Sequence, residues 1–227
     1  MIVINGFVSN DLKQHLLLGG THPVARRHAN LIIAGGDFSF TLPDGYTQLK
    51  YIESSGTQYI DTGFVPNQDT RLVMKTEFKI TGSNMFLFGA RTSEKENSFA
   101  FNAYTSNIYR SHYNTTWLDY DSSVSFSEPF TIDKNKNTTK LNGVHTVTEQ
   151  YAKFECPCNL TLFALNTKTA AQTFATAKLY DCKIYNNGKL IRDFIPCINS
   201  SGNIGLYDAV TKAFYKNSGT GSFIAGK

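Results

Sequence analysis

Residues 178–196 read Lys-Leu-Tyr-Asp-Cys-Lys-Ile-Tyr-Asn-Asn-Gly-Lys-Leu-Ile-Arg-Asp-Phe-Ile-Pro, and polar and apolar residues alternate on both sides of Asn186-Asn187-Gly188. An Asn-Gly step between two alternating runs is the strongest short-range signal for a β-hairpin, because both residues tolerate a positive φ. A second pair of short runs follows, residues 204–208 and 213–215. The end of the chain therefore predicts antiparallel β structure.

The same two-residue period runs back through the chain. Residues 71–80 place Leu72, Met74 and Phe78 on one face of a strand and charged residues on the other, which predicts a half-buried strand. Further strands are expected at 85–90, 98–104, 107–113 and 129–133, a tight hairpin at 140–145, and one central strand at 160–165. About a dozen short strands with almost no helical periodicity indicate an all-β sandwich or barrel.

Composition agrees with one β domain and excludes two classes of partner. The 227 residues suit a single sandwich, since such domains run to about 200–250 residues, and the aromatic content of 13% suits pleated surfaces. The net charge of +4 is mild, and only Arg26-Arg27 with His22 and His28 forms a local basic cluster, so we expect no nucleic-acid binding. No apolar run reaches the roughly 18 residues that a membrane span needs, so no membrane insertion is expected.

The first residues lack the basic start, long apolar run and small-residue cleavage site of a secretion signal. We therefore expect synthesis in a cytoplasm and release by a route other than secretion, such as virion assembly followed by lysis. The four cysteines are predicted to be buried free thiols: Cys156-Pro-Cys158 has one residue between its thiols rather than two, and Cys182 falls on the apolar face of a strand.

Residues 1–41 differ from the remainder. The phrases Leu16-Leu-Leu-Gly-Gly20 and Leu31-Ile-Ile-Ala-Gly-Gly36 are apolar bursts that end in glycine pairs. This segment carries more apolar residues than its length can bury, which is typical of a docking or oligomerisation arm. Turn chemistry at Leu42-Pro-Asp-Gly-Tyr46 marks a boundary, so residues 42–227 are expected to form the domain.

Three phrases of this domain carry a family resemblance: residues 42–63 (Leu-Pro-Asp-Gly-Tyr-Thr-Gln-Leu-Lys-Tyr-Ile-Glu-Ser-Ser-Gly-Thr-Gln-Tyr-Ile-Asp-Thr-Gly), residues 178–197, and residues 205–223 (Gly-Leu-Tyr-Asp-Ala-Val-Thr-Lys-Ala-Phe-Tyr-Lys-Asn-Ser-Gly-Thr-Gly-Ser-Phe). The domain resembles the concanavalin-A-like, laminin-G-like jelly rolls of bacteriophage and prophage virion proteins and gut bacterial surface proteins. The resemblance implies an antiparallel two-sheet jelly-roll sandwich. It implies no particular ligand, because this scaffold hosts lectins, glycosidases and inert modules.

Catalytic signatures are absent from the sequence. Jelly-roll glycosidases use a Glu-x-Asp-x-x-Glu strand, and the near misses here are Glu94-Lys-Glu96, in a polar turn, and Asp119-Tyr-Asp121, on one strand face. The nucleophile elbow, the phosphate-binding loop and the His-Glu-x-x-His motif do not occur either. We expect no enzyme and no cofactor. The resemblance leaves calcium open at a rim, without choosing among Asp61, Asp69 and Asp208, because calcium needs six to eight oxygen ligands.

The stretch from residue 104 to 120 is the richest in groups that hold sugars, namely aromatic rings for stacking and planar polar groups for hydroxyls. The alternative is that Trp117, the only tryptophan, fills the core and that the tyrosines are ordinary strand residues. The candidate carbohydrate-binding residues are Tyr109, His112, Tyr113, Asn114, Trp117 and Asp119.

These observations favour a non-enzymatic virion protein, such as a capsid or tail decoration, a fibre or a receptor-binding component. Its jelly roll would bind host or mucosal glycan, while residues 1–41 would bind other virion proteins or form a homo-oligomer. A carbohydrate-binding module of a bacterial surface protein is the alternative, with the cell surface as its location. A diverged glycoside hydrolase that uses Asp119 and Asp121 is the second alternative.

Overall fold

The computed structural model divides the chain into two units, Met1–Ser39 and Phe40–Lys227. It describes residues 41–79, 84–105, 108–120 and 128–227. The predicted arm, residues 1–41, lies outside the described residues except for Thr41, so its role stays a prediction.

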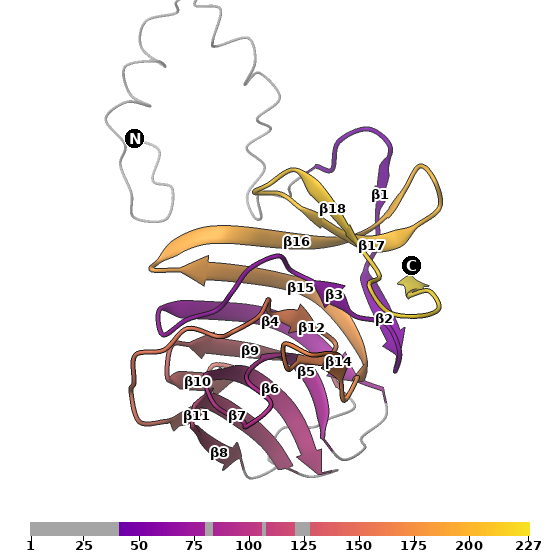
Figure 1. Cartoon of the computed structure of the whole chain (residues 1–227). Helices are drawn as coiled ribbons and strands as arrows, with labels where there is room; N and C mark the ends of the chain where they lie inside the picture. The colour runs from indigo at the N-terminus through magenta and orange to yellow at the C-terminus, as the bar shows by residue number, and fades with distance from the viewer. Residues whose placement is uncertain (1–40, 80–83, 106–107, 121–127) are drawn as a thin grey trace, which may run out of the picture. The chain divides into compact units, whose positions relative to one another are not determined.

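The described residues form strands in two sheets and contain no helix (Figure 1). The larger sheet has eleven strands and the main order β11-β10-β9-β4-β15-β16-β17-β18, while the smaller has eight and the main order β14-β13-β5-β6-β7-β8. The large sheet contains β1 (Tyr46–Gln48), β2 (Tyr51–Ser55), β4 (Thr70–Phe78), β9 (Phe130–Asn135), β10 (Thr138–Leu141), β11 (His145–Thr148), β15 (Thr176–Asn186), β16 (Lys189–Asn199), β17 (Ile204–Asp208), β18 (Ala213–Lys216) and β19 (Ile224–Gly226). The small sheet contains β3 (Ile60–Asp61), β5 (Met85–Ala90), β6 (Ser98–Thr105), β7 (Ile108–Asn114), β8 (Thr116–Tyr120), β12 (Thr161–Leu162), β13 (Leu165–Asn166) and β14 (Ala171–Gln172).

The strand pairs are antiparallel apart from the single pairing of β13 with β5. The prediction of an all-β protein with two antiparallel sheets is confirmed. The jelly-roll order of connections stays an expectation from the sequence resemblance.

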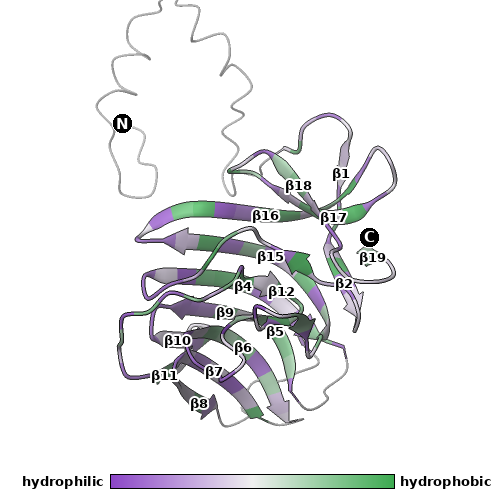
Figure 2. Cartoon of the chain, viewed as in Figure 1, coloured by the Kyte–Doolittle hydropathy of each residue, from purple (hydrophilic) through white to green (hydrophobic). Residues whose placement is uncertain are grey.

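The hairpin of β15 and β16 has the predicted turn, because Asn187 and Gly188 adopt φ values of 48° and 76°. Its first strand pairs with β4 along one edge and with β16 and β2 along the other. Hydrophobic and hydrophilic residues alternate along both strands of the hairpin in Figure 2. The predicted closing pair is also present, with Leu206 opposite Tyr215 and Tyr207 opposite Phe214.

The core lies between the inner faces of the two sheets. The predicted apolar face of β4 is buried there, since Leu72, Met74 and Phe78 are at most 2% exposed. From the small sheet, the ring of Tyr109 lies 6.0 Å from that of Phe78 and 5.1 Å from that of Phe130. Aromatic rings from both sheets therefore hold the layers together.

One predicted strand, residues 160–165, is wrong. The chain forms β12 and β13 there, separated by Phe163 and Ala164, and the φ of Phe163 is 67°. The backbone of Phe163 donates to Leu87 O and accepts from Ala175 N, and its ring packs on Phe223. These long-range contacts compensate for a φ that is unfavourable for a bulky residue.

A charged cluster is buried in the core between the sheets. The Lys134 ammonium lies 3.6 Å from Glu149 Oε1 and donates to Ser111 Oγ at 2.8 Å. Ser111 donates in turn to Glu149, and the rings of Phe99 and Tyr113 flank the ammonium at 5.2 and 5.8 Å from their centroids. Burial lowers the pKa of Lys134, while the Glu149 carboxylate acts in the opposite direction.

All four cysteines are free thiols. Cys156, Cys182 and Cys197 are buried and Cys158 is half-buried, which confirms the prediction that Cys182 is a core residue. Burial raises the pKa of each thiol, to about 11 for Cys197. The described residues also include no helix that is long and apolar enough to cross a membrane.

Candidate functional site

The β7–β8 hairpin, at the end of the small sheet's main path, carries every predicted carbohydrate-binding residue. Successive residues of a strand point to opposite faces, so the hairpin divides this set. Tyr109 and Tyr113 point into the core and are fully buried. The Tyr113 hydroxyl donates to Ala152 O at 3.0 Å, and burial raises its pKa to about 12. We therefore remove both tyrosines from the set that could touch a ligand.

Asn114 serves the turn of this hairpin. Its φ is 52°, a left-handed conformation that asparagine tolerates better than most residues. The next residues return as β8, with Tyr113 opposite Thr116. The conformation of the turn explains the residue without a ligand.

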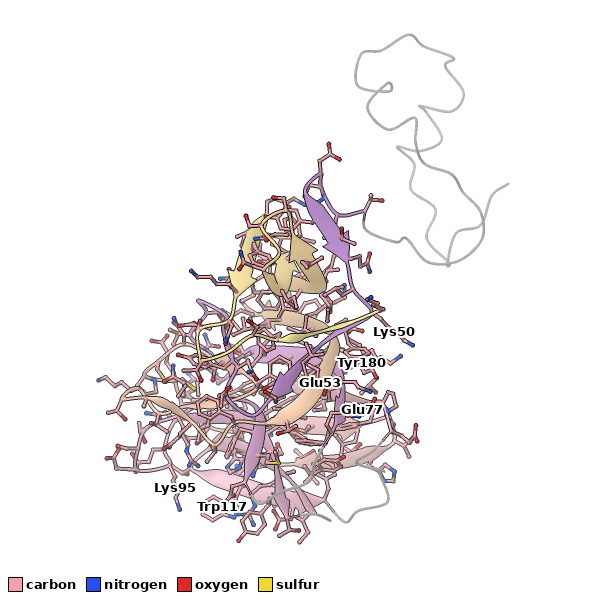
Figure 3. The ribbon with its side chains drawn as sticks, turned by 90° about the vertical axis from the view of Figure 1, so that its right-hand side faces the viewer. Lys50, Glu53, Glu77, Lys95, Trp117 and Tyr180 are labelled. Atoms are coloured by element: carbon pink, nitrogen blue, oxygen red, sulfur yellow. The ribbon has the colours of Figure 1, made fainter. Side chains whose placement is uncertain are left out.

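His112, Trp117 and Asp119 share the outer face of the small sheet. His112 lies opposite Trp117 across the two strands, and Arg110 lies opposite Asp119. The Trp117 side chain is 48% exposed, which excludes the alternative that it fills the core. In Figure 3, Trp117 lies toward one end of the domain with Lys95, and Glu53, Glu77 and Tyr180 form a separate group.

Arg110 organises the polar part of this face. It binds both oxygens of the Asp119 carboxylate, at 2.6 and 2.9 Å. Its guanidinium carbon lies 3.4 Å from the ring centroid of Tyr104 and 5.8 Å from that of Trp117. The hydrogen bonds to Asp119 raise the pKa of Arg110 above its usual value. The face therefore presents an exposed indole beside a fixed guanidinium–carboxylate pair.

His112 lies beneath this surface and is only 6% exposed. Its Nε2 lies 2.9 Å from Asn102 Oδ1, and its ring is 5.5 Å from Phe86 and 6.5 Å from Trp117. Burial, followed by the nearby cations Arg91, Lys134 and Arg110, lowers its pKa well below the ordinary value. His112 is consequently neutral at neutral pH, and Nε2 carries the proton that Asn102 accepts.

Arg91 covers a small apolar cluster on the same face, formed by Phe86, Ala100 and Leu165. A Cβ at Gly89 would lie 2.7 Å from Leu165 Cδ1 and 3.0 Å from Ala100 Cβ, so a larger residue there would push on this cluster. The Arg91 guanidinium lies 5.6 Å from the Phe86 ring, and its buried Nε makes no hydrogen bond with the described residues. Burial lowers the pKa of Arg91 from its usual value.

The sequence missed Asn102, Phe86 and Arg91 as members of this face. They come from β5 and β6 or follow β5, and they meet β7 only through the register in which Asn102 lies opposite Arg110 and Ala100 opposite His112. That register is a long-range property of the sheet. Tyr104 and Arg110 lie in the aromatic-rich stretch but were not included in the predicted set.

The geometry of this face does not support the glycoside hydrolase alternative. Arg110 occupies both Asp119 oxygens, so a general acid or nucleophile at Asp119 would first have to lose this partner. Asp121, the second carboxylate of that hypothesis, lies outside the described residues.

The three aspartates considered for calcium each have partners within the chain. Asp61 accepts from Gly63 N, Asp69 pairs with Lys136 at 3.0 Å, and Asp208 accepts from Asp193 N and the Thr211 hydroxyl. Within the described part of the chain, no three His, Cys, Asp or Glu residues are grouped so that they could hold a metal ion.

Two polar hollows mark a second surface, on the large sheet. They have volumes of about 360 and 330 Å³ and share Asn135 and Lys136 in their walls. Their charged groups pair with one another, as in Arg71 with Asp133 at 2.8 Å. The first hollow is lined by Asp69, Arg71, Asn135, Lys136, Tyr185, Asn187 and Gly188, and the second by Asp133, Asn135, Lys136, Asn137, Thr138 and Lys140.

Comparison with known proteins adds no family: no protein-family model matches the chain, and no curated protein matches it. The chemistry of the two surfaces must therefore carry the functional argument. The outer face of the small sheet offers an exposed aromatic plane, while the hollows offer a tyrosine beside amides and paired charges.

Proposed function

We propose that residues 42–227 form a non-enzymatic carbohydrate-binding domain and that the chain is a structural component of a bacteriophage virion. The observation that carries the carbohydrate part is the half-exposed ring of Trp117 on the outer face of the small sheet. The virion part is supported by the sequence resemblance and by the apolar content of residues 1–41.

An exposed indole beside fixed polar groups has the chemistry of a sugar platform. The C–H face of a pyranose ring packs on an aromatic plane, and its hydroxyls hydrogen-bond to planar donors and acceptors. Arg110 and Asp119 form such a planar pair near the Trp117 ring. Because that pair is fixed by two hydrogen bonds and by Tyr104, it loses little entropy when a sugar binds.

The single tryptophan gives this proposal a direct test. Trp117 is the only tryptophan in the chain, so its emission reports on this face alone. We expect polysaccharides from gut bacteria and from mucus to include at least one that shifts Trp117 emission saturably. The variant Trp117→Ala should lose binding of the labelled polysaccharide by about 10- to 100-fold, as expected for a central aromatic anchor.

Tyr185→Ala is the matched control, because Tyr185 is the aromatic residue beside the hollow on the large sheet. Full affinity in Tyr185→Ala and loss in Trp117→Ala would place the sugar on the small sheet. The reverse pattern would move the site to the hollow and refute the assignment made here.

The virion part of the proposal has its own test. Particles induced from a host that carries the gene should contain the chain, whereas a bacterial surface protein would fractionate with the cell envelope. If residues 1–41 assemble the chain, light scattering of the full-length protein should show an oligomer. The variants Leu17→Asp and Ile32→Asp should dissociate it by placing charge in the apolar phrases.

A further inference from the structure

The outer face of the small sheet is electrostatically unbalanced near Trp117. Arg110 is neutralised by Asp119, whereas Arg91 makes no ion pair with any described carboxylate. Arg91 belongs to this face through its contact with the Phe86 ring, and Figure 3 shows Lys95 at the same end of the domain as Trp117. Glu94 and Glu96 belong to the same turn as Lys95 but are exposed and form no ion pair within the described residues.

Arg91 is held in a costly position. Its guanidinium lies against the Phe86 ring over the cluster of Phe86, Ala100 and Leu165, and its Nε is buried without an acceptor. A buried donor without a partner destabilises the folded chain, and burial lowers the pKa of this guanidinium for the same reason. Arg91 as a whole is only half-buried, so an anion on this face would pair with its charge.

The neutral state of His112 removes the nearest alternative partner. Its Nε2 donates to Asn102, and Asn102 in turn donates to Asn84 Oδ1 at 3.5 Å. This chain of hydrogen bonds supplies no negative charge to Arg91. Arg91 therefore keeps a positive charge, without a carboxylate partner among the described residues, on the face that carries Trp117.

We propose that the site at Trp117 takes an acidic glycan, whose sugar ring packs on the indole while a carboxylate or sulfate of the same chain binds Arg91 and Lys95. This inference rests on the proposed function and narrows its substrate class. A guanidinium binds carboxylate or sulfate through two parallel hydrogen bonds, and such charge-assisted bonds are roughly twice as strong as neutral ones.

Matched ligands test the inference with the full-length chain. Tetragalacturonate and its fully methyl-esterified form have the same sugar rings and differ in charge, and Trp117 emission reports the binding of each. We expect the acid to bind at least about tenfold more tightly than the ester, with a preference that weakens as salt is raised. Dextran sulfate against dextran, in parallel, distinguishes a sulfate ligand from a carboxylate ligand.

Two variants locate the charge. Arg91→Met keeps the apolar stem over Phe86 and should lose about tenfold or more in affinity for the acid while leaving the ester unchanged. Arg91→Lys keeps the cation without the fork and should show a smaller loss, which also covers the case in which Arg91→Met fails to fold. Lys189→Met is the control, because Lys189 is an exposed cation at the end of the β15–β16 hairpin.

The outcomes of these binding experiments separate a failure of the acidic-glycan inference from a failure of the proposed function. Equal binding of acid and ester, with Trp117 still responsive, overturns the acidic-glycan inference but leaves the carbohydrate site intact. Equal losses in Arg91→Met and Lys189→Met overturn it as well, because general charge would then explain the preference. If neither the sugars nor their sulfated and neutral dextran counterparts alter Trp117 emission, while another surface binds glycan, the proposed function of this face fails and the inference fails with it.

Discussion

The outer faces of the two sheets differ in how completely their charged side chains are paired. On the large sheet, Glu77 receives Lys178 at 2.9 Å and the Tyr180 hydroxyl at 2.7 Å, and Lys183 pairs with Asp193 at 2.8 Å. On the small sheet, Arg91 has no carboxylate partner among the described residues and Trp117 is exposed. Paired charge stabilises a fold, whereas unpaired charge beside an exposed ring lowers stability and suits ligand binding.

We expect the largest effect on stability from the buried ion pair of Lys134 and Glu149, where the same comparison of paired and unpaired charge applies to the core. Lys134→Met leaves the Glu149 carboxylate buried without its cation, so we expect unfolding free energy to fall by about 3–5 kcal/mol. Urea unfolding followed by far-UV circular dichroism measures the change. The double variant Lys134→Met with Glu149→Leu should recover most of the loss; if it does not, the pair contributes through more than charge compensation.

The paired charges on the outer face of the large sheet should have the second-largest effect on stability. Burial acts to raise the pKa of Glu77, but hydrogen bonds from Lys178 and Tyr180 outweigh burial and lower it. Glu77→Gln removes the charge that these donors need, and we expect a loss of about 2–3 kcal/mol in the same urea experiment. Glu53→Gln is the control and should cost far less; Glu53 lies on β2, which pairs with β15 on the side away from β4. Similar losses for both would erase the distinction between paired and unpaired charge on this face.

We expect the loss of folding stability at low pH to come from His112 in the small sheet. His112 has a folded-state pKa well below its unfolded value near 6.5, so below pH 6.5 the unfolded chain binds more protons. The stability that neutral His112 contributes is therefore present above pH 6.5 and is lost as the pH falls below 6.5. Unfolding midpoints across this range should flatten in His112→Gln. An unchanged slope in His112→Gln would contradict the assignment of this acid sensitivity to His112.

Arg91→Met should have the smallest effect on stability, and this variant should not destabilise the chain. Arg91→Met removes a buried donor without a partner while keeping the stem over Phe86, so we expect stability to stay equal or rise by up to about 1 kcal/mol. The same variant should lose acidic-glycan binding. A clear loss of stability would show that Arg91 belongs to the fold and would remove the contrast between the two faces.

The two-residue period of the sequence accounts for most of the fold and for part of the site. It correctly placed Leu72, Met74 and Phe78 on the buried face of β4. Applied to β7, the same alternation separates Tyr109 and Tyr113 from His112, so the division of the predicted site could have been derived from the sequence.

The remainder depends on contacts between distant segments. The exposure of Trp117 follows from the position of β8 at the end of the small sheet's main path, which the order of strands decides. The approach of Arg91 and Phe86 to His112 follows from the β5–β6–β7 register. The break at Phe163 follows from hydrogen bonds to Leu87 and Ala175. None of these has a local signal in the sequence.

The reactivity of the four free thiols would report how often each part of the fold opens locally. A thiol reacts with an alkylating reagent only when it is exposed and ionised, and Cys156, Cys182 and Cys197 are buried with raised pKa values. Cys182 lies on β15 and Cys197 on β16, whereas Cys158 is half-buried in the segment before β12. The order in which these thiols become labelled would therefore rank how often each part of the sandwich opens, without adding a single probe to the molecule.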